Sequence, residues 1–305
     1  MIKVSVVTTV LVALGVAAGC SSADPAASET DTATSALGAN SELNNPLPRH
    51  LATQERFAKE FAGGGGSGGN LSYHGGGTLT SAHVVPIYWG PSWSTSGSAD
   101  NAMSTTLTSY VANYGTTSHY NVITQYYSGK PATYIQESNL GSTAYYDSST
   151  PPADVTDADV QAEAQKIISA HGFDASAIYE VFLPASSYSS DGTSTSCGGP
   201  SLKYCAYHGN FTATEGNVKY ASMPYPSCGG CQSAGFDTAQ NFEHFISHET
   251  REAVTDEDGN AWYDHRGYEA DDKCAWTPAP FVDSSTGYAY QYEWSNKASG
   301  CVQGM

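Results

Sequence analysis

Side chains that can bind metals and transfer protons are concentrated in one stretch of the chain, residues 241–276. His248 and Glu252 are the first and last residues of an H-E-x-x-E pattern in this stretch. Residues four apart lie on the same face of a helix, so both could bind one cation. Glu269 and Asp272 follow in an acidic segment, and either could supply a third ligand. An imidazole with two carboxylates is a donor set that zinc accepts and that is also open to harder ions.

The helical pattern around these residues predicts that the titratable groups point inward. At about 100° per residue the apolar side chains form one stripe, with Glu249 inside it and His248 and Glu252 along its edge. The stripe consists of Phe242, Phe245, Ile246 and Ala253. Burial of charged groups is costly unless a partner or a metal compensates for it. A surface helix with a charged i, i+4 pair is the simpler interpretation of the pentapeptide taken alone.

The geometry resembles the H-E-x-x-H helix of zinc proteases, in which the Glu is a general base. Glu252 replaces the second His here, which leaves a carboxylate ligand. The resemblance makes Glu249 the candidate catalytic base and His248, Glu252, Glu269 and Asp272 the candidate metal ligands. Zn²⁺ is the expected ion, and Ca²⁺ is the structural alternative.

Four other histidines could contribute to a site, and each also has a simpler interpretation. His244 lies four residues before His248 and could add a ligand, but a half-exposed position on the flank of the helix is the better match. His208 follows a predicted strand and could face a cleft. His265 could orient a substrate or be a solvated loop residue, and His74 precedes a glycine run and is typical of a turn. The sequence has no G-x-S-x-G pattern, so a serine hydrolase is not expected.

Composition excludes some partners and indicates an exported protein. The chain has 305 residues and a formal net charge of −18, which argues against binding to nucleic acid or to an anionic membrane surface. Charged residues make up only 14% of the chain, whereas Gly, Ser, Thr and Tyr are abundant, as is common in secreted proteins. The tyrosines could line a groove for a peptide or a cell-wall polymer, or half-buried sheets.

The N-terminal residues predict export. Residues 1–19 have the pattern of a signal peptide, and the following Cys20 resembles the acylated cysteine of a bacterial lipobox. Ala17 stands where a lipobox usually has Leu, so a plain secretory signal is the alternative. We expect a membrane-anchored lipoprotein or a secreted protein. Residues 21–70 are predicted to be a disordered tether ending in a Gly-rich linker, with a short amphipathic helix over 48–62, and the folded domain is expected at 71–305.

If Cys20 carries a lipid, six cysteines remain, an even number in an exported chain. Proximity in the sequence predicts the pairs Cys197–Cys205, Cys228–Cys231 and Cys274–Cys301 among 15 possible connectivities. The C-x-x-C at Cys228 could also bind a metal or act in redox chemistry, but a structural disulfide is the better match, since no second C-x-x-C is present.

The periodicity of the remaining chain predicts an α+β domain with a mixed sheet and helices packed against it. The expected order is β-α-β-α-β-β-β-α, followed by a loop-rich tail. The predicted strands are 83–89, 142–146, 177–183, 202–208, 218–223 and 288–294, and the predicted helices are 99–114 capped by Ser98, 156–171 capped by Thr156, and the helix from 241. Residues 120–127 could be a helical turn or a strand.

The stretch S-H-E-x-x-E-x-V-T-D followed by G-Y-E-x-x-D-x-C resembles the phosphate-induced protein 1, or EXORDIUM-like, family, over roughly residues 71–303. K-Y-C-A-Y-H-G upstream and the start Y-H-G-G-G-T-L-T are also similar. The resemblance implies an exported α+β domain, and its plant members are extracellular proteins linked to growth. Glu257 stands where the family usually has Pro. The residues that match the family motif are His248, Glu249, Glu252, Glu269, Asp272 and Cys274.

Two functions are compatible with these observations. The first is a metal-dependent hydrolase, a zincin-like peptidase in which Glu249 takes a proton from water and the strands before the helix offer an edge to an extended peptide. The second is a non-catalytic exported module for signalling or wall binding, in which the same residues form a buried carboxylate–histidine network or a structural cation site. Convergence of the ligands around an open cleft favours the first function, and convergence without access favours the second.

Overall fold

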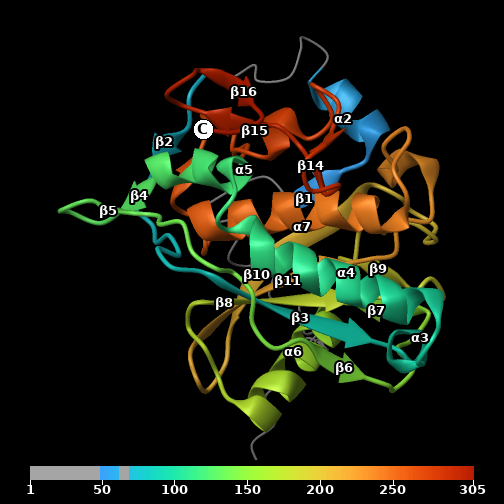
Figure 1. The fold of residues 1–305 in the computed structure, drawn as a ribbon. Helices are drawn as coiled ribbons and strands as arrows, with labels where there is room; N and C mark the ends of the chain where they lie inside the picture. The colour runs from blue at the N-terminus through green and yellow to red at the C-terminus, as the bar shows by residue number, and fades with distance from the viewer. Residues whose placement is uncertain (1–48, 62–68) are drawn as a thin grey trace, which may run out of the picture. The chain divides into compact units, whose positions relative to one another are not determined.

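A mixed six-stranded sheet forms the centre of the domain in the computed structural model, which describes residues 49–61 and 69–305 (Figure 1). The strand order is β1-β10-β11-β8-β3-β6. Strands β11, β8, β3 and β6 run parallel to one another, whereas β10 is antiparallel to both β11 and β1. The strands span β1 His50–Ala52, β3 His83–Trp89, β6 Tyr145–Asp147, β8 Ala177–Phe182, β10 Tyr204–Thr212 and β11 Asn217–Met223.

Helices cover both faces of this sheet, because its central strands carry apolar side chains on both sides. Helix α6 (Asp157–His171) packs on one face, with Val160, Ala164 and Ile168 buried against β8 and β11. Helices α4 (Ala99–Tyr114) and α7 (Thr238–Thr255) pack on the other face, where α7 runs across the middle of the molecule (Figure 1). The α+β class with a mixed sheet is therefore confirmed.

Side-chain caps fix where the long helices begin. Ser98 accepts from the Asn101 amide at the start of α4, and Thr156 forms a capping box with Asp159 at the start of α6, as predicted for both residues. Asp237 forms a capping box with Gln240, so α7 begins three residues earlier than the sequence suggested. All α7 residues from Asn241 to Thr255 are buried, more than an amphipathic stripe alone predicts.

Short elements form the connections and the C-terminal part. The predicted strand 288–294 divides into two pieces in different two-stranded sheets, and residues 118–125 are helical turns. The remaining helices are α2 Gln54–Glu60, α3 Pro91–Ser94, α5 Ser118–Asn121, η1 Val122–Gln125, η2 Gly229–Cys231 and η3 Asp272–Cys274. The two-stranded sheets pair β2 Ser72–Tyr73 with β12 Trp262–Tyr263, β4 Tyr127–Ser128 with β5 Thr133–Tyr134, β7 Asp154–Thr156 with β9 Tyr188–Ser190, β13 Phe281–Val282 with β14 Ala289–Tyr290, and β15 Glu293–Ser295 with β16 Gly300–Val302.

The folded part begins earlier than the sequence suggested. Residues 49–61 were expected to belong to the tether, with a helix at most, yet β1 is an edge strand of the main sheet. Helix α2 follows it, as predicted, and buries Phe57 and Phe61 in the same core. The pairing of three residues with a strand about 150 positions away leaves no local signal in the sequence. The predicted signal peptide, the lipobox-like Cys20, the tether to residue 48 and linker residues 62–68 lie outside the described residues.

The described residues contain three disulfides, and one of them matches the sequence-based pairing. Cys274 is bonded to Cys301, as predicted. The other two predicted pairs are wrong, because the structure joins Cys197 to Cys228 and Cys205 to Cys231. The folding of β10 brings Cys205 beside η2, so spatial proximity overrides proximity in the sequence. Cys228 and Cys231 of the C-x-x-C pattern are therefore not bonded to each other, and each is bonded to a cysteine in a different segment.

Within residues 49–61 and 69–305, no helix combines the length and the apolar character that crossing a membrane requires.

Candidate metal centre

Helix α7 places His248, Glu249 and Glu252 between the sheet and the C-terminal loops, and all three are fully buried. The inward direction predicted from the apolar stripe is confirmed by this burial. The acidic segment that contains Glu269 and Asp272 lies next to the same turn of α7, since the Asp272 amide donates to Glu252 Oε1 over 2.8 Å. The two halves of the sequence motif therefore meet in the fold.

One His and two carboxylates converge at ligand-like distances. His248 Nε2 lies 3.2 Å from Glu252 Oε2 and 3.9 Å from Asp272 Oδ1. In a tetrahedral zinc site with metal–ligand distances of about 2.0–2.1 Å, neighbouring ligand atoms lie about 3.3 Å apart. His248, Glu252 and Asp272 thus satisfy the spacing of a metal-binding group.

The hydrogen bonds of His248 determine which ring nitrogen carries its proton. Its Nδ1 lies 3.0 Å from Gln291 Oε1, an amide oxygen that can only accept, while the amide nitrogen of Gln291 donates to Asp271 over 2.8 Å. Burial lowers the pKa of His248, so the ring is neutral with its proton on Nδ1. Nε2 therefore presents a lone pair. Neither this atom nor Glu252 Oε2 makes a hydrogen bond within the described residues.

A second group lies beside the first and shares Glu252. His208, on β10, is 2.9 Å from Glu249 Oε2 through its Nδ1, and its Nε2 is 3.7 Å from Glu269 Oε2. Glu249 Oε1 accepts from the Leu51 amide over 3.2 Å. His208, Glu249 and Glu252 also satisfy metal-binding spacing. Both Glu269 carboxylate oxygens and His208 Nε2 are buried without a hydrogen-bond partner among the described residues.

The electrostatics of the cluster favour an added positive charge. Burial raises the pKa of Glu249, Glu252 and Glu269 well above the ordinary value, and neighbouring carboxylates raise each of them further. Burial also raises the pKa of Asp272, to about 7. Burial lowers the pKa of His208 well below its ordinary value, so this imidazole does not supply the missing charge. A bound cation would favour the ionised carboxylates and offset these shifts.

The structure brings together all five predicted site residues, but it separates Glu249 from the group formed by His248, Glu252 and Asp272. Glu269 faces His208 instead of His248. The sequence indicates only that His208 could face a cleft, and the register of β10 turns its side chain into the cluster. Gln291 was missed, although a glutamine inside the aromatic run 288–294 was a usable signal.

The other candidate ligands from the sequence either lie outside these two groups or are already held in disulfides. His244 shares the Gln291 oxygen at 2.9 Å and is fully buried, contrary to the half-exposed flank position. His74 stacks on Tyr263 with ring centroids 3.7 Å apart. His265 belongs to none of the metal-binding groups found in the described part of the chain. The cysteines 197, 228 and 231 also lie close together, but all are held in disulfides.

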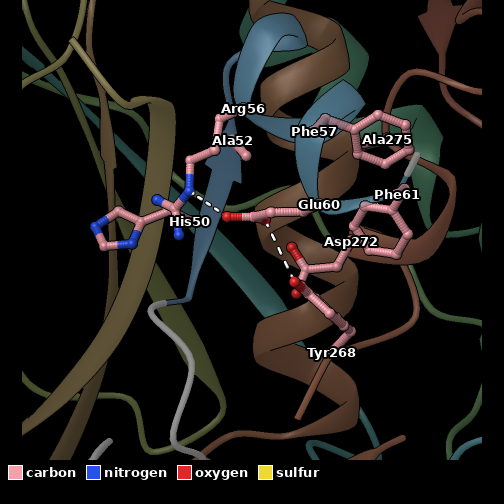
Figure 2. Close-up of a pocket in the computed structure, with 9 residues that line it drawn as sticks. All are labelled: His50, Ala52, Arg56, Phe57, Glu60, Phe61, Tyr268, Asp272 and Ala275. Carbon is pink, nitrogen blue, oxygen red and sulfur yellow. Dashed lines mark hydrogen bonds and ion pairs between the residues drawn. The ribbon is translucent and has the colours of Figure 1, made fainter. Parts of the chain in front are cut away.

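Access to the cluster is narrow. Asp272 is 9% exposed, whereas the other four predicted site residues are completely buried. A pocket of about 10 Å³ reaches Asp272, and its other walls come mainly from β1 and α2. Figure 2 shows Glu60 of α2 between Arg56 and Tyr268, next to Asp272. A volume of about this size admits one water molecule and no substrate.

Comparisons with protein-family models, with curated proteins and with solved structures give no match for this chain. The resemblance to the EXORDIUM-like family stays a prediction from sequence motifs.

Proposed function

We propose that this domain is a metal-dependent peptidase with a cation held by His248, Glu252 and Asp272. The observation that carries the proposal is that His248 Nε2 and Glu252 Oε2 are fully buried and lie 3.2 Å apart, and neither atom makes a hydrogen bond among the described residues. Two acceptors at this distance repel each other unless a proton or a cation lies between them. The nearby Asp272 Oδ1 completes a three-ligand set that leaves further coordination positions for water or substrate.

The ion follows from the donor atoms. One imidazole nitrogen with two carboxylate oxygens suits Zn²⁺, and it remains open to harder ions because oxygen ligands predominate. Zn²⁺ is our first assignment, and Ca²⁺ is the structural alternative. Gln291 orients His248 through Nδ1, as outer-shell partners of metal-bound histidines commonly do.

Glu249 is the proposed general base. It lies next to His248 in the chain, its carboxylate is outside the three-ligand group, and it faces β10 and β1. A bound metal would supply polarisation of a water and of the scissile carbonyl. Glu249 would accept the proton of that water, and the His208 Nδ1–H would hold its ionised carboxylate in place. The arrangement is zincin-like in the roles of its residues.

A structural cation site in a non-catalytic exported module is the second candidate function. The complete burial of His248, Glu249 and Glu252 favours it, because a closed metal site with no entry for substrate is typical of structural metals. Both functions share the same ligands, so they differ only in what Glu249 does.

Metal analysis of the purified full chain, with two substitutions, separates these functions. His248→Ala removes a ligand and should reduce the bound metal to background in either case. Glu249→Gln keeps the size and removes the base, so metal should stay bound while peptide hydrolysis falls about 10²-fold or more. A Glu249→Gln protein that loses its metal, or that keeps full hydrolytic activity, would rule out the base. Absence of bound metal in the wild-type protein would rule out both functions.

We also propose that the protein is exported and anchored to a membrane through a lipid on Cys20, or secreted if that cysteine is unmodified. The lipobox-like sequence and three disulfides support this, since disulfides persist in oxidising compartments. Mass spectrometry of the mature N-terminus tests the anchor. A mature chain that starts downstream of Cys20 would refute the anchor, and one that starts at an unmodified Cys20 would show the secreted form.

A further inference from the structure

Strand β1 occupies the edge of the main sheet that lies against the candidate centre. It is antiparallel to β10, with His50 opposite Tyr207 and Leu51 opposite Ala206. Backbone hydrogen bonds join the two strands at both ends, from the His208 amide to the Arg49 carbonyl at 3.2 Å and from the Thr53 amide to the Lys203 carbonyl at 3.2 Å. An extended peptide that binds to an exposed sheet edge forms the same pattern. The edge of β10, where an extended peptide substrate could pair, is therefore occupied by β1 of the same chain.

The opposite edge of β1 contacts the proposed base. The Leu51 amide donates to Glu249 Oε1 over 3.2 Å, while His208 holds Oε2. The Leu51 backbone therefore lies directly against the Glu249 carboxylate and hinders the approach of a water molecule to it. During peptide cleavage the base passes its proton to the leaving backbone nitrogen. A bound substrate would therefore also place a backbone nitrogen beside Glu249, as Leu51 does.

The side chains of β1 occupy two different pockets. His50 lies between Tyr204 and Tyr207, with ring centroids 4.6 and 5.5 Å away, and its Nε2 is 3.2 Å from Asp191 Oδ2. Leu51 is fully buried in the core that contains α7. The first pocket fits a cationic or aromatic side chain, since it combines aromatic rings with a carboxylate. The second pocket fits an aliphatic side chain.

Helix α2 extends this coverage over the acidic segment. Phe61 packs on Tyr268 with ring centroids 4.6 Å apart, and the Tyr268 hydroxyl donates to Glu60 over 3.4 Å. The Trp276 indole donates to the Ala52 carbonyl over 2.7 Å. The narrow pocket of Figure 2, which Asp272 lines, lies among residues of this covering segment.

The covering segment also contributes positive charge. Arg49 is 3% exposed, and it lies directly beside Gly259, where a Cβ would meet its guanidinium. Burial raises the pKa of Glu269, and the Arg49 charge acts in the opposite direction. A cationic residue thus accompanies β1 into an acidic site.

We propose that residues 49–61 are an inhibitory cover that occupies the place of an extended peptide substrate along β10, and that the substrate pairs a cationic or aromatic residue with a following large aliphatic one. The proposal rests on the peptidase function proposed above. Cleavage of the chain between the cover and residue 69, followed by loss of the cover, exposes Glu249 and Asp272. While the segment is tethered, its effective concentration at the site is of the order of millimolar, so it outcompetes dilute peptides.

A cleavable form of the full chain tests the cover. Residues 62–68 are replaced by the recognition site of a specific protease, and the folded, metal-loaded protein is measured before and after cutting and removal of the released segment. A fluorescent peptide containing a His-Leu pair should bind to the cut protein about 10-fold or more tightly than to the uncut protein. A synthetic peptide of residues 49–61 should displace it. Equal binding before and after cutting, or no displacement, would overturn the cover.

Substitutions in α2 provide a second route that needs no cutting. Phe57→Ala with Phe61→Ala weakens the packing of the cover and should increase binding of the same fluorescent peptide to the uncut chain. Lys59→Ala is the matched control, because Lys59 is exposed on the same helix and forms an ion pair with the equally exposed Glu55. An equal response of the two variants would also overturn the cover.

Binding and hydrolysis distinguish the two proposals. If cutting increases peptide binding but the cut, metal-loaded protein does not hydrolyse the peptide, the peptidase function is refuted. The proposal that the cover blocks a peptide-binding strand edge is then still supported. Hydrolysis at equal rates in cut and uncut protein would refute the cover and leave the peptidase function standing. A Gly-Asp peptide in place of His-Leu tests the side-chain preference, and equal binding of both would refute it.

Discussion

Two buried clusters of charged groups contain residues of α7, and only the first of them has a cationic side chain of its own among the described residues. In the first, Arg251 pairs with Asp271 and, over 2.5 Å, with Glu293. All three side chains are fully buried, and the two carboxylates raise the pKa of Arg251 against the effect of burial. In the second, His248 and Glu252 face each other without such a cation. The comparison shows that this core tolerates buried carboxylates where a cation accompanies them, so the second cluster should acquire one from solution.

Removing the internal cation should have the largest effect. Arg251→Leu leaves Asp271 and Glu293 buried without a partner charge, which should lower the free energy of unfolding by about 3–5 kcal/mol. Denaturant unfolding followed by circular dichroism measures this change. Arg251→Lys is the control, since it keeps a charge but loses the fork geometry, and it should cost less. A loss below about 1 kcal/mol in Arg251→Leu would contradict the comparison.

The disulfide that closes the acidic segment should act on both clusters, because Asp271 and Asp272 lie just before Cys274. Exchange of Cys274 and Cys301 for Ser should cost about 3.5 kcal/mol in the chain-entropy model for a sequence separation of 27. It should also weaken metal binding. Exchange of Cys197 and Cys228, with a separation of 31, is the matched control, with a similar loss of stability but unchanged metal affinity. Equal metal affinity in both pairs would show that the disulfide does not position Asp272.

Removal of the external cation should act on the second cluster only. A chelator should lower the free energy of unfolding by about 2.7 kcal/mol if the metal was present at about 100 times its dissociation constant. Thermal unfolding with and without chelator, and after addition of Zn²⁺ or Ca²⁺, measures the loss and identifies the ion. His248→Ala should abolish the response, whereas Arg251→Lys should retain it. A wild-type protein that is insensitive to the chelator at equilibrium would argue against a bound ion.

Glu180, a buried carboxylate outside both clusters, offers the most pH-dependent effect. Glu180 on β8 is fully buried, accepts from the Thr250 hydroxyl over 2.7 Å, and has its pKa raised to about 8 by burial. The folded state therefore binds its proton more tightly than the unfolded state, so this group lowers stability as the pH rises from about 4.5 to 8. Glu180→Gln should make this dependence shallower by up to about 1.4 kcal/mol per pH unit. Unfolding of both proteins at pH 5 and pH 8 is the measurement, and parallel curves would contradict the shifted pKa.

The sequence predicted those residues of the candidate centre that lie on one helix or a short distance after it. The apolar stripe of α7 indicated the inward direction of His248 and Glu252, and the short separation to Asp272 made its return to the helix plausible. His208 could not be assigned, because its place depends on the register of β10 against β11, with His208 opposite Ala221. Gln291 lies in a strand whose division in two was not apparent from its alternating pattern.

The cover was beyond sequence reasoning for a related reason. His50, Leu51 and Ala52 form too short a run to predict a strand, and their partner is β10, far along the chain. A glycine run between the two suggested a domain boundary instead. The disulfides of β10 show the same limit, since Cys205 pairs with Cys231 only after the strand has been placed in the sheet.

The Cys197–Cys228 and Cys205–Cys231 disulfides interleave along the chain, each enclosing one end of the other. Any single break of the backbone between Cys205 and Cys228 therefore leaves two fragments joined by both bonds. The turn at residues 213–216, between β10 and β11, lies inside this interval. A protein nicked at that turn would migrate as one species in a gel without reductant and as two with it. Strand β10, which carries His208, would therefore stay covalently linked to the fragment that contains β11 after cleavage by a foreign protease.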